Sequence, residues 1–228
     1  MWGGITLATL LCLLLGRLAA RVVPGGAVLV QCVLLLWAGA WMVPGFWRHR
    51  AAYRERYGRQ AYRYLFYRFL VPFVVGAGAA VYFPVLVGGE RLLPPVIAYG
   101  LAAYLFVTVQ LIEVRGKEIF WDIEWRGFVY SVFRERGRVV SAGIFRWLRH
   151  PVYSAAMRFA LALSLVRNNL PALSCAVLVA VGVAVWGRIE EGELKRKDTD
   201  YAMYCQRTPA FFVVRPVRFW RFLLTGEE

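Results

Sequence analysis

A short basic segment in the C-terminal half of the chain combines arginine, histidine and tyrosine at the start of an apolar run. Residues 141–153 read SAGIFRWLRHPVY, so Arg146, Arg149 and His150 lie within five residues. Pro151 favours a helix start there, because proline is well tolerated in the first helical turn. The N–H groups and the dipole of a helix start attract anions, so this segment could bind an anionic group. A basic flank that anchors a membrane helix is the alternative.

Two adjacent carboxylates form the second group with chemical potential. Glu190 and Glu191 lie in the segment RIEEGEL, just after an apolar run that ends at Gly187, and Tyr201 and Tyr204 follow. Acidic side chains at a cytoplasmic membrane face are poor anchors, because the adjoining leaflet is itself anionic. We therefore interpret the carboxylates as candidates for ligand binding, with a solvated helix face as the alternative.

The composition indicates that membrane-spanning helices position these groups. Of the 228 residues, 60% are hydrophobic and 18% are charged, and the mean hydropathy is +0.51. These values exclude a disordered or fibrous chain and argue against a soluble domain. The expected fold is an all-α integral membrane protein with about six transmembrane helices, of which the first and fifth are short. The apolar runs are residues 2–16, 25–47, 69–87, 92–112, 152–166 and 170–187.

The last two apolar runs are expected to form a tight antiparallel helical hairpin. Only residues 167–169 separate a basic helix end from Leu170, and Pro171 suits a helix start. We expect two domains. Residues 1–138 would hold the N-terminal transmembrane helices with their basic loops, and residues 139–228 would form a core with the hairpin and a cytoplasmic C-terminal segment.

The net charge of +14 predicts the orientation of the chain in the membrane. Seven basic residues lie in residues 48–68, eight in residues 115–149 and eight from residue 188 onward, against four in the opposite connections. The positive-inside rule assigns the three basic segments, and with them both termini, to the cytoplasm. We expect an integral protein of a bacterial inner (plasma) membrane whose basic residues meet the lipid bilayer and not a nucleic acid.

Residues 48–68 also interleave arginine with tyrosine. This pattern predicts an interfacial helix with arginines near the lipid headgroups. Basic and aromatic residues can also bind RNA, but the flanking spans make lipid the nearer anion. The chain has two histidines and four cysteines without paired spacing, so we predict no metal site.

The two C-terminal motifs carry a family resemblance. The order RxxRHPxY, then a helical hairpin, then EExxL with two later tyrosines resembles the isoprenylcysteine carboxyl methyltransferase and phospholipid methyltransferase superfamily of integral membrane enzymes. The resemblance covers about residues 139–216. Its matching positions are Gly143, Arg146, Arg149, His150, Pro151, Tyr153, Glu190, Glu191, Leu194, Tyr201, Tyr204, Pro209 and Pro216. The chain departs from the pattern at Ile144, Phe145, Ala155, Lys197 and Asp198.

The resemblance implies S-adenosylmethionine as cofactor and a methyltransferase-like core in residues 139–228. One glutamate would accept hydrogen bonds from the ribose hydroxyls or the amino group, Arg146 or Arg149 would pair with the cofactor carboxylate, and Tyr201 or Tyr204 would face the sulfonium. The acceptor would be lipophilic or small and membrane-partitioning, with methylation at O, N or S left open. The implied cofactor-binding residues are Gly143, Arg146, His150, Pro151, Tyr153, Glu190, Glu191, Tyr201 and Tyr204.

The sequence names no definite catalytic residue, and Arg149 and Arg158 are the candidates. Arg158 lies within the fifth apolar run, where an unpaired charge costs on the order of several kcal/mol. It could bind a carboxylate or phosphate of the methyl acceptor. Alternatively it could pair with Glu113 or extend to the membrane interface.

Two other functions fit part of the pattern. Membrane sterol or enone reductases that use NADPH share an RHPxY-like element and a tyrosine-rich end, which Tyr204, Cys205 and Pro209 resemble. The glutamate pair fits the methyltransferase pattern better. A catalytically silent membrane protein that keeps the fold for assembly or lipid binding is the third possibility, because several motif positions are altered.

Overall fold

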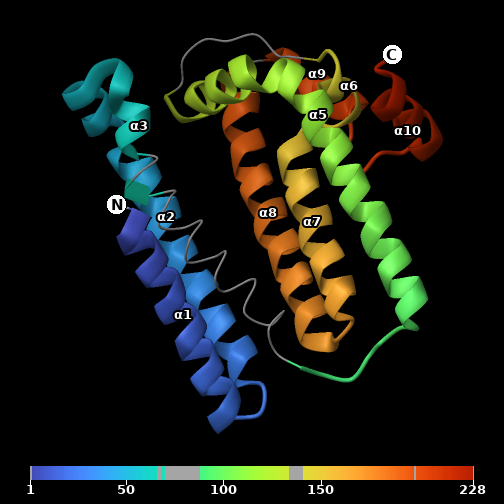
Figure 1. The fold of residues 1–228 in the computed structure, drawn as a ribbon. Helices are drawn as coiled ribbons and strands as arrows, with labels where there is room; N and C mark the ends of the chain where they lie inside the picture. The colour runs from blue at the N-terminus through green and yellow to red at the C-terminus, as the bar shows by residue number, and fades with distance from the viewer. Residues whose placement is uncertain (1, 66–67, 70–87, 134–140, 198, 228) are drawn as a thin grey trace. The chain divides into compact units, whose positions relative to one another are not determined.

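The computed structural model describes residues 2–65, 68–69, 88–133, 141–197 and 199–227. Every regular element within these ranges is a helix (Figure 1), which confirms the all-α expectation. The chain separates into two compact units. One comprises Met1–Pro94 and Arg167–Leu178, and the other comprises Pro95–Val166 and Val179–Glu228.

The first unit begins with two long helices, α1 (Trp2–Val22) and α2 (Gly26–Tyr57). A short 3-10 helix, η1 (Gly58–Gln60), and helix α3 (Ala61–Leu65) follow. Tyrosine rings pack across this turn, because Tyr57 and Tyr64 stack with their centroids 4.1 Å apart. The segment with interleaved arginine and tyrosine is therefore largely helical.

The predicted apolar runs fall on helices over most of the residues that the structure describes. The first two runs lie within α1 and α2, and the fifth lies within α7 (Pro151–Arg167). Among the described residues, two segments are long and apolar enough to cross a membrane, Pro95–Gly116 of α5 (Pro95–Phe133) and Leu170–Arg196 of α8 (Leu170–Lys197). Most of the third run and the expected domain boundary after residue 138 lie outside the described residues. The total of six spans and the cytoplasmic side stay predictions.

Two asparagines connect α7 to α8. Asn168 has a φ of 53°, a left-handed conformation that asparagine tolerates at the end of a helix. Its side chain accepts a hydrogen bond from the Leu93 N–H at 2.9 Å and donates one to the Leu93 carbonyl at 2.6 Å. Asn169 caps α8, because its Oδ1 accepts a hydrogen bond from the Ala172 N–H at 2.9 Å. The tight connection expected from the sequence is therefore present.

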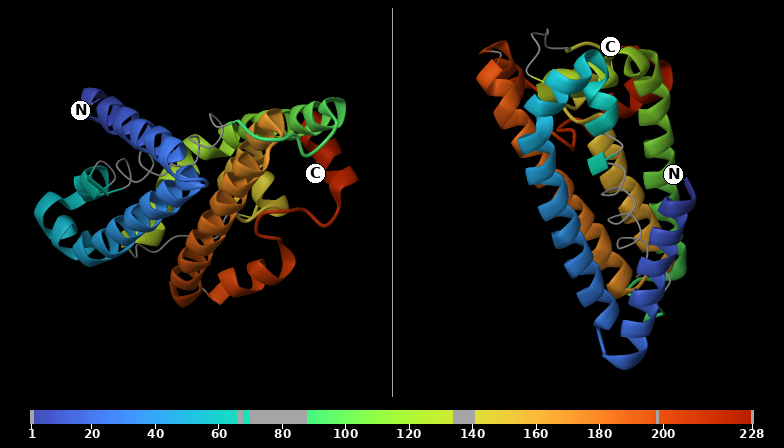
Figure 2. Two further views of the ribbon diagram at one scale, coloured as in Figure 1. Left: turned by 90° about the horizontal axis from the view of Figure 1, so that it is seen from below. Right: turned by 90° about the vertical axis from the view of Figure 1, so that its left-hand side faces the viewer.

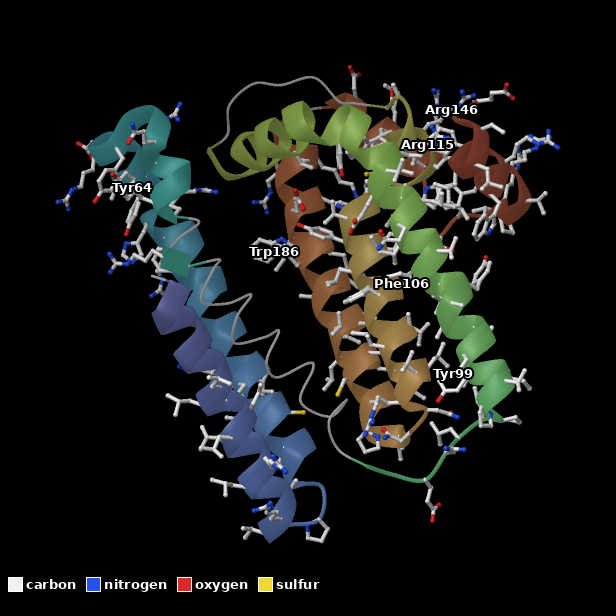
Figure 3. The ribbon with its side chains drawn as sticks, in the orientation of Figure 1. Tyr64, Tyr99, Phe106, Arg115, Arg146 and Trp186 are labelled. Carbon is white, nitrogen blue, oxygen red and sulfur yellow. The ribbon has the colours of Figure 1, made fainter. Side chains whose placement is uncertain are left out.

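The second unit has its core where α5 meets the C-terminal helix α10 (Pro216–Thr225). Arg115 donates from Nε to the Leu223 carbonyl at 2.9 Å and from Nη2 to the Leu224 carbonyl at 2.8 Å. These bonds satisfy carbonyls at the end of α10, where a cation is favoured. Figure 3 shows Arg115 in the middle of α5 on the side of α10, and both views of Figure 2 keep the two helices adjacent. The core residues are Val109, Ile112, Ile144, Leu148, Ala155, Phe219, Phe222 and Leu223.

Candidate active site

The RHP motif lies between two helices of the second unit. Gly143, with a φ of 55°, precedes the short helix α6 (Ile144–Trp147), and Leu148 is extended. The N–H groups of Arg149 and His150 donate to the carbonyls of Pro209 and Ala210 at 2.9 and 3.1 Å. These two N–H groups are therefore used within the protein. Helix α7 begins at Pro151, as predicted.

A buried ion-pair cluster joins the start of α7 to the end of α8. The Nε atom of Arg149 donates to Oε1 of Glu191 at 2.8 Å, and Nε2 of His150 lies 3.0 Å from the same oxygen. His150 and Glu191 are both buried. Removing a buried charge from water is unfavourable unless it is paired and hydrogen-bonded, and Glu191 meets both conditions. Glu191 thus connects two motifs that are 41 residues apart.

Glu190 has a different environment from its neighbour. The hydroxyl of Tyr153 donates to Oε2 of Glu190 at 2.9 Å, and Nδ1 of His150 lies 4.0 Å from the same oxygen. The side chain of Glu190 is 19% exposed, against 10% for Glu191. Of the two carboxylates, Glu190 is therefore the more accessible to a ligand.

Aromatic rings enclose the imidazole of His150. Its ring stacks on Tyr153 at a centroid distance of 5.2 Å and on Phe211 at 5.4 Å. Gly187 of α8 allows this approach, because a Cβ there would lie 2.9 Å from Cζ of Phe211 and 3.7 Å from Nε2 of His150. Gly187, Glu190 and Glu191 share one face of α8, since residues three and four apart are neighbours on a helix.

Helix α9 (Thr199–Arg207) adds the two motif tyrosines to this region. Nη1 of Arg149 donates to the Cys205 carbonyl at 2.6 Å and to the Thr208 carbonyl. Tyr204 donates to the Phe145 carbonyl at 2.5 Å, and its ring lies 5.7 Å from that of Tyr201. Both phenols are buried. Burial raises the pKa of both, and the charge of Glu191 adds to the effect for Tyr201.

The structure brings most of the predicted site residues together. Arg149, His150, Tyr153, Glu190 and Glu191 form one cluster, and Arg149 and Phe145 link it to the tyrosines of α9.

Two predicted arginines, Arg146 and Arg158, have surroundings of their own. Arg146 is exposed on α6 (Figure 3). Arg158 lies two helical turns further along α7 and has no direct contact with either glutamate.

The sequence interpretation missed Phe211, Gly187 and Ser154. Ser154 donates to the Phe211 carbonyl, and Gly187 faces the Phe211 ring. Each of these contacts joins segments more than 20 residues apart, and none of the three residues carries a chemical signature of its own. Their contacts became evident only once the helices were placed.

A comparison with protein families supports the motif assignment. Residues 97–197 match the family described as phospholipid methyltransferase. No curated protein and no solved structure matches the chain. The matched region includes the RHP motif and both glutamates but ends before Tyr201 and Tyr204. Over residues 97–197 the chain is similar to the phospholipid methyltransferase family, in the integral membrane superfamily that also contains the isoprenylcysteine carboxyl methyltransferases.

Proposed function

We propose that this protein is an S-adenosylmethionine-dependent methyltransferase that acts on a lipophilic acceptor at the membrane interface. The family match indicates a membrane methyltransferase. The observation that carries the finer proposal is the different environment of two adjacent carboxylates. Glu191 is paired with Arg149 and His150 and is buried, whereas Glu190 accepts a hydrogen bond from Tyr153 and has the more exposed side chain.

The chemistry of this donor set fits the cofactor. When bound, S-adenosylmethionine supplies a methyl group already activated on a sulfonium. Glu190 would accept hydrogen bonds from its hydroxyls or amino group, with His150 and Tyr153 beside it. Arg146 or Arg149 would pair with the cofactor carboxylate, and Arg149 would do so while it also donates to Glu191 and to the Cys205 carbonyl. The rings of Tyr201 and Tyr204 can face a cation.

The protein's own contribution is positioning and electrostatics. A cluster held by ion pairs and packed rings keeps its donors and acceptors in place, which is what methyl transfer by in-line displacement requires of an enzyme. A carboxylate acceptor needs no general base. An amine or thiol acceptor would need one, and His150 or Glu190 would then be the candidate.

Calorimetric binding to the purified full-length protein tests the cofactor. We expect S-adenosylmethionine to bind the unaltered protein and to bind Glu190→Gln at least about tenfold more weakly, which corresponds to about 1.4 kcal/mol. Glu90→Gln, which changes an exposed carboxylate outside the cluster, is the matched control and should bind normally. Binding of NADPH in place of S-adenosylmethionine would contradict the proposal and favour the reductase alternative.

Transfer of a radiolabelled methyl group identifies the acceptor class. Membranes that contain the protein would be incubated with labelled S-adenosylmethionine and then separated into protein, phospholipid and volatile fractions. We expect label in a lipophilic product. Cofactor binding without label in any fraction would instead support a catalytically silent protein.

A further inference from the structure

Arg158 is a buried charge that the cluster at Glu190 and Glu191 does not use. Its residue is 8% exposed, and it lies in α7 within the sequence MRFALAL. His150, Ser154 and Arg158 follow one another at intervals of four residues, so they share one face of the helix. The side chain therefore points toward the same side of α7 as the histidine.

The guanidinium of Arg158 is held by neutral groups. Nη1 donates to the Ser154 carbonyl at 3.1 Å, to the Ser154 hydroxyl and to the Phe211 carbonyl at 3.2 Å. The guanidinium carbon lies 5.1 Å from the centroid of the Phe212 ring. All of these bonds use one nitrogen. Among the described residues, no hydrogen bond uses Nε or Nη2, and neither atom is fully buried without a partner.

Among the residues whose side chains the structure describes, no carboxylate forms an ion pair with Arg158. Glu113, the partner considered from the sequence, is exposed on α5, and the hydrogen bonds of Arg158 go to Ser154 and Phe211 instead. A buried ion without a counter-ion is strongly unfavourable, and cation–π contact with one ring compensates for only part of that energy. The Nε and Nη2 edge presents parallel N–H donors, the geometry with which arginine binds a carboxylate or phosphate at two points.

We propose that Arg158 binds the anionic group, a carboxylate or phosphate, of a lipophilic methyl acceptor. This inference rests on the proposed function for the identity of the acceptor. Phe212, which is 61% exposed beside the guanidinium, offers apolar surface to the acceptor's hydrocarbon chain. Phe211 links the two sites, because its carbonyl accepts from Arg158 and its ring stacks on His150.

The spacing of the two sites limits the shape of the acceptor. Arg158 lies eight positions after His150, which corresponds to a distance of about 12 Å along a helix axis. An acceptor with its anion at Arg158 must therefore be extended if its reacting atom is to lie near His150. An amphiphile with a polar group and a chain satisfies this condition.

Ligand preference of the purified full-length protein in a neutral detergent tests the proposal without methyl transfer. The probes are the anionic amphiphiles dodecyl phosphate and laurate. Dodecanol is the control with the same chain and no charge, and inorganic phosphate is the control with the charge and no chain. We expect the unaltered protein to bind both anionic amphiphiles at least about tenfold more tightly than dodecanol, since a hydrogen bond to a charged group contributes about 1.5–3 kcal/mol. Inorganic phosphate should bind more weakly than dodecyl phosphate.

Arg158→Gln should abolish this preference, and Arg158→Lys should retain part of it, because lysine keeps the charge and loses the two-point geometry. Arg167→Gln, at the end of the same helix, is the matched control and should keep the full preference. A structural role of Arg158 alone would lower the melting temperature and leave the ratio of anionic to neutral affinity unchanged. That result in folded Arg158→Gln, or no preference in the unaltered protein, would overturn the proposal.

Two further measurements distinguish a methyl acceptor from a bound lipid as the source of the anion. They also distinguish failure of the anion site from failure of the proposed methyltransferase function. Phosphatidylglycerol vesicles that displace both probes, together with normal methyl transfer by Arg158→Gln, would assign the anion to a bound lipid and contradict an acceptor site. S-adenosylmethionine affinity is measured on the same variants. It should be normal in Arg158→Gln, so failure of the anion site is distinguishable from failure of the proposed function.

Discussion

The Nε2 atom of His150 lies 3.0 Å from Oε1 of Glu191, and this contact joins the residue before α7 to the last turns of α8. Arg149 bonds to the same oxygen and to carbonyls at the end of α9. Arg149 and Glu191 together therefore connect three segments of the second unit. Glu191 has a mainly organising role in this arrangement, and Glu190 is left as the carboxylate that a ligand can reach more easily.

Glu191→Ala should destabilise the protein more than Glu190→Ala does. Removing Glu191 takes the shared carboxylate from half-buried Arg149 and buried His150, which should cost about 3 kcal/mol. Removing Glu190 loses the hydrogen bond from Tyr153, worth about 1 kcal/mol, at a more exposed position. Thermal unfolding of the two variants in detergent measures the difference. Equal melting temperatures would show that Glu191 does not hold the three segments together.

Gly187→Ala should destabilise the site, and Gly182→Ala should not. A Cβ at residue 187 would lie 2.9 Å from the Phe211 ring, whereas a Cβ at residue 182 has no atom within 4 Å. We expect Gly187→Ala to lose about 1–3 kcal/mol by overpacking and Gly182→Ala to gain up to about 1 kcal/mol from helix propensity. Melting temperatures test both values. Weaker S-adenosylmethionine binding by Gly187→Ala alone would further connect Phe211 to the site.

Asn168→Ala should be more harmful than Asn168→Gly. Both variants lose the two side-chain hydrogen bonds with Leu93. Alanine must also adopt a φ near 53°, which costs about 1–2 kcal/mol more for a residue with a Cβ. Melting of the purified variants gives the difference. If glycine and alanine are equally destabilising, the left-handed backbone is not the reason for asparagine here.

Tyr201 should keep its proton at a pH where exposed tyrosines have lost theirs. Burial raises the pKa of its phenol from the ordinary value of 10, and the nearby carboxylates add to the effect. The unfolded chain loses this proton near pH 10 and the folded chain does not, so the free energy of unfolding should fall as the pH rises above about 10. Phenolate absorbance should show a late-titrating component that Tyr201→Phe removes. If the Tyr201 phenol instead loses its proton at the same pH as the exposed tyrosines, the burial of its ring is contradicted.

The helical elements could be predicted from the sequence because their signals are local. Apolar runs predicted α5, α7 and α8, and Pro151 and the residues 167–169 predicted where helices begin and end. The RHP motif and the glutamate pair also predicted that distant segments would form one site, since the order of the motifs resembles a known superfamily. These conclusions depend on composition and spacing, which do not change when helices are packed.

Tertiary structure alone decided which groups each motif residue contacts. Glu190 and Glu191 are adjacent in sequence, but consecutive residues point about 100° apart around a helix, so neighbouring segments determine their surroundings. Because α8 packs against the start of α7, Glu191 contacts Arg149 and His150, and Glu190 accepts a hydrogen bond from Tyr153. In the same way Phe211, which no motif marks, comes to lie between His150 and Arg158. Contacts between segments far apart in sequence depend on how the helices pack, and no local pattern in the chain encodes that packing.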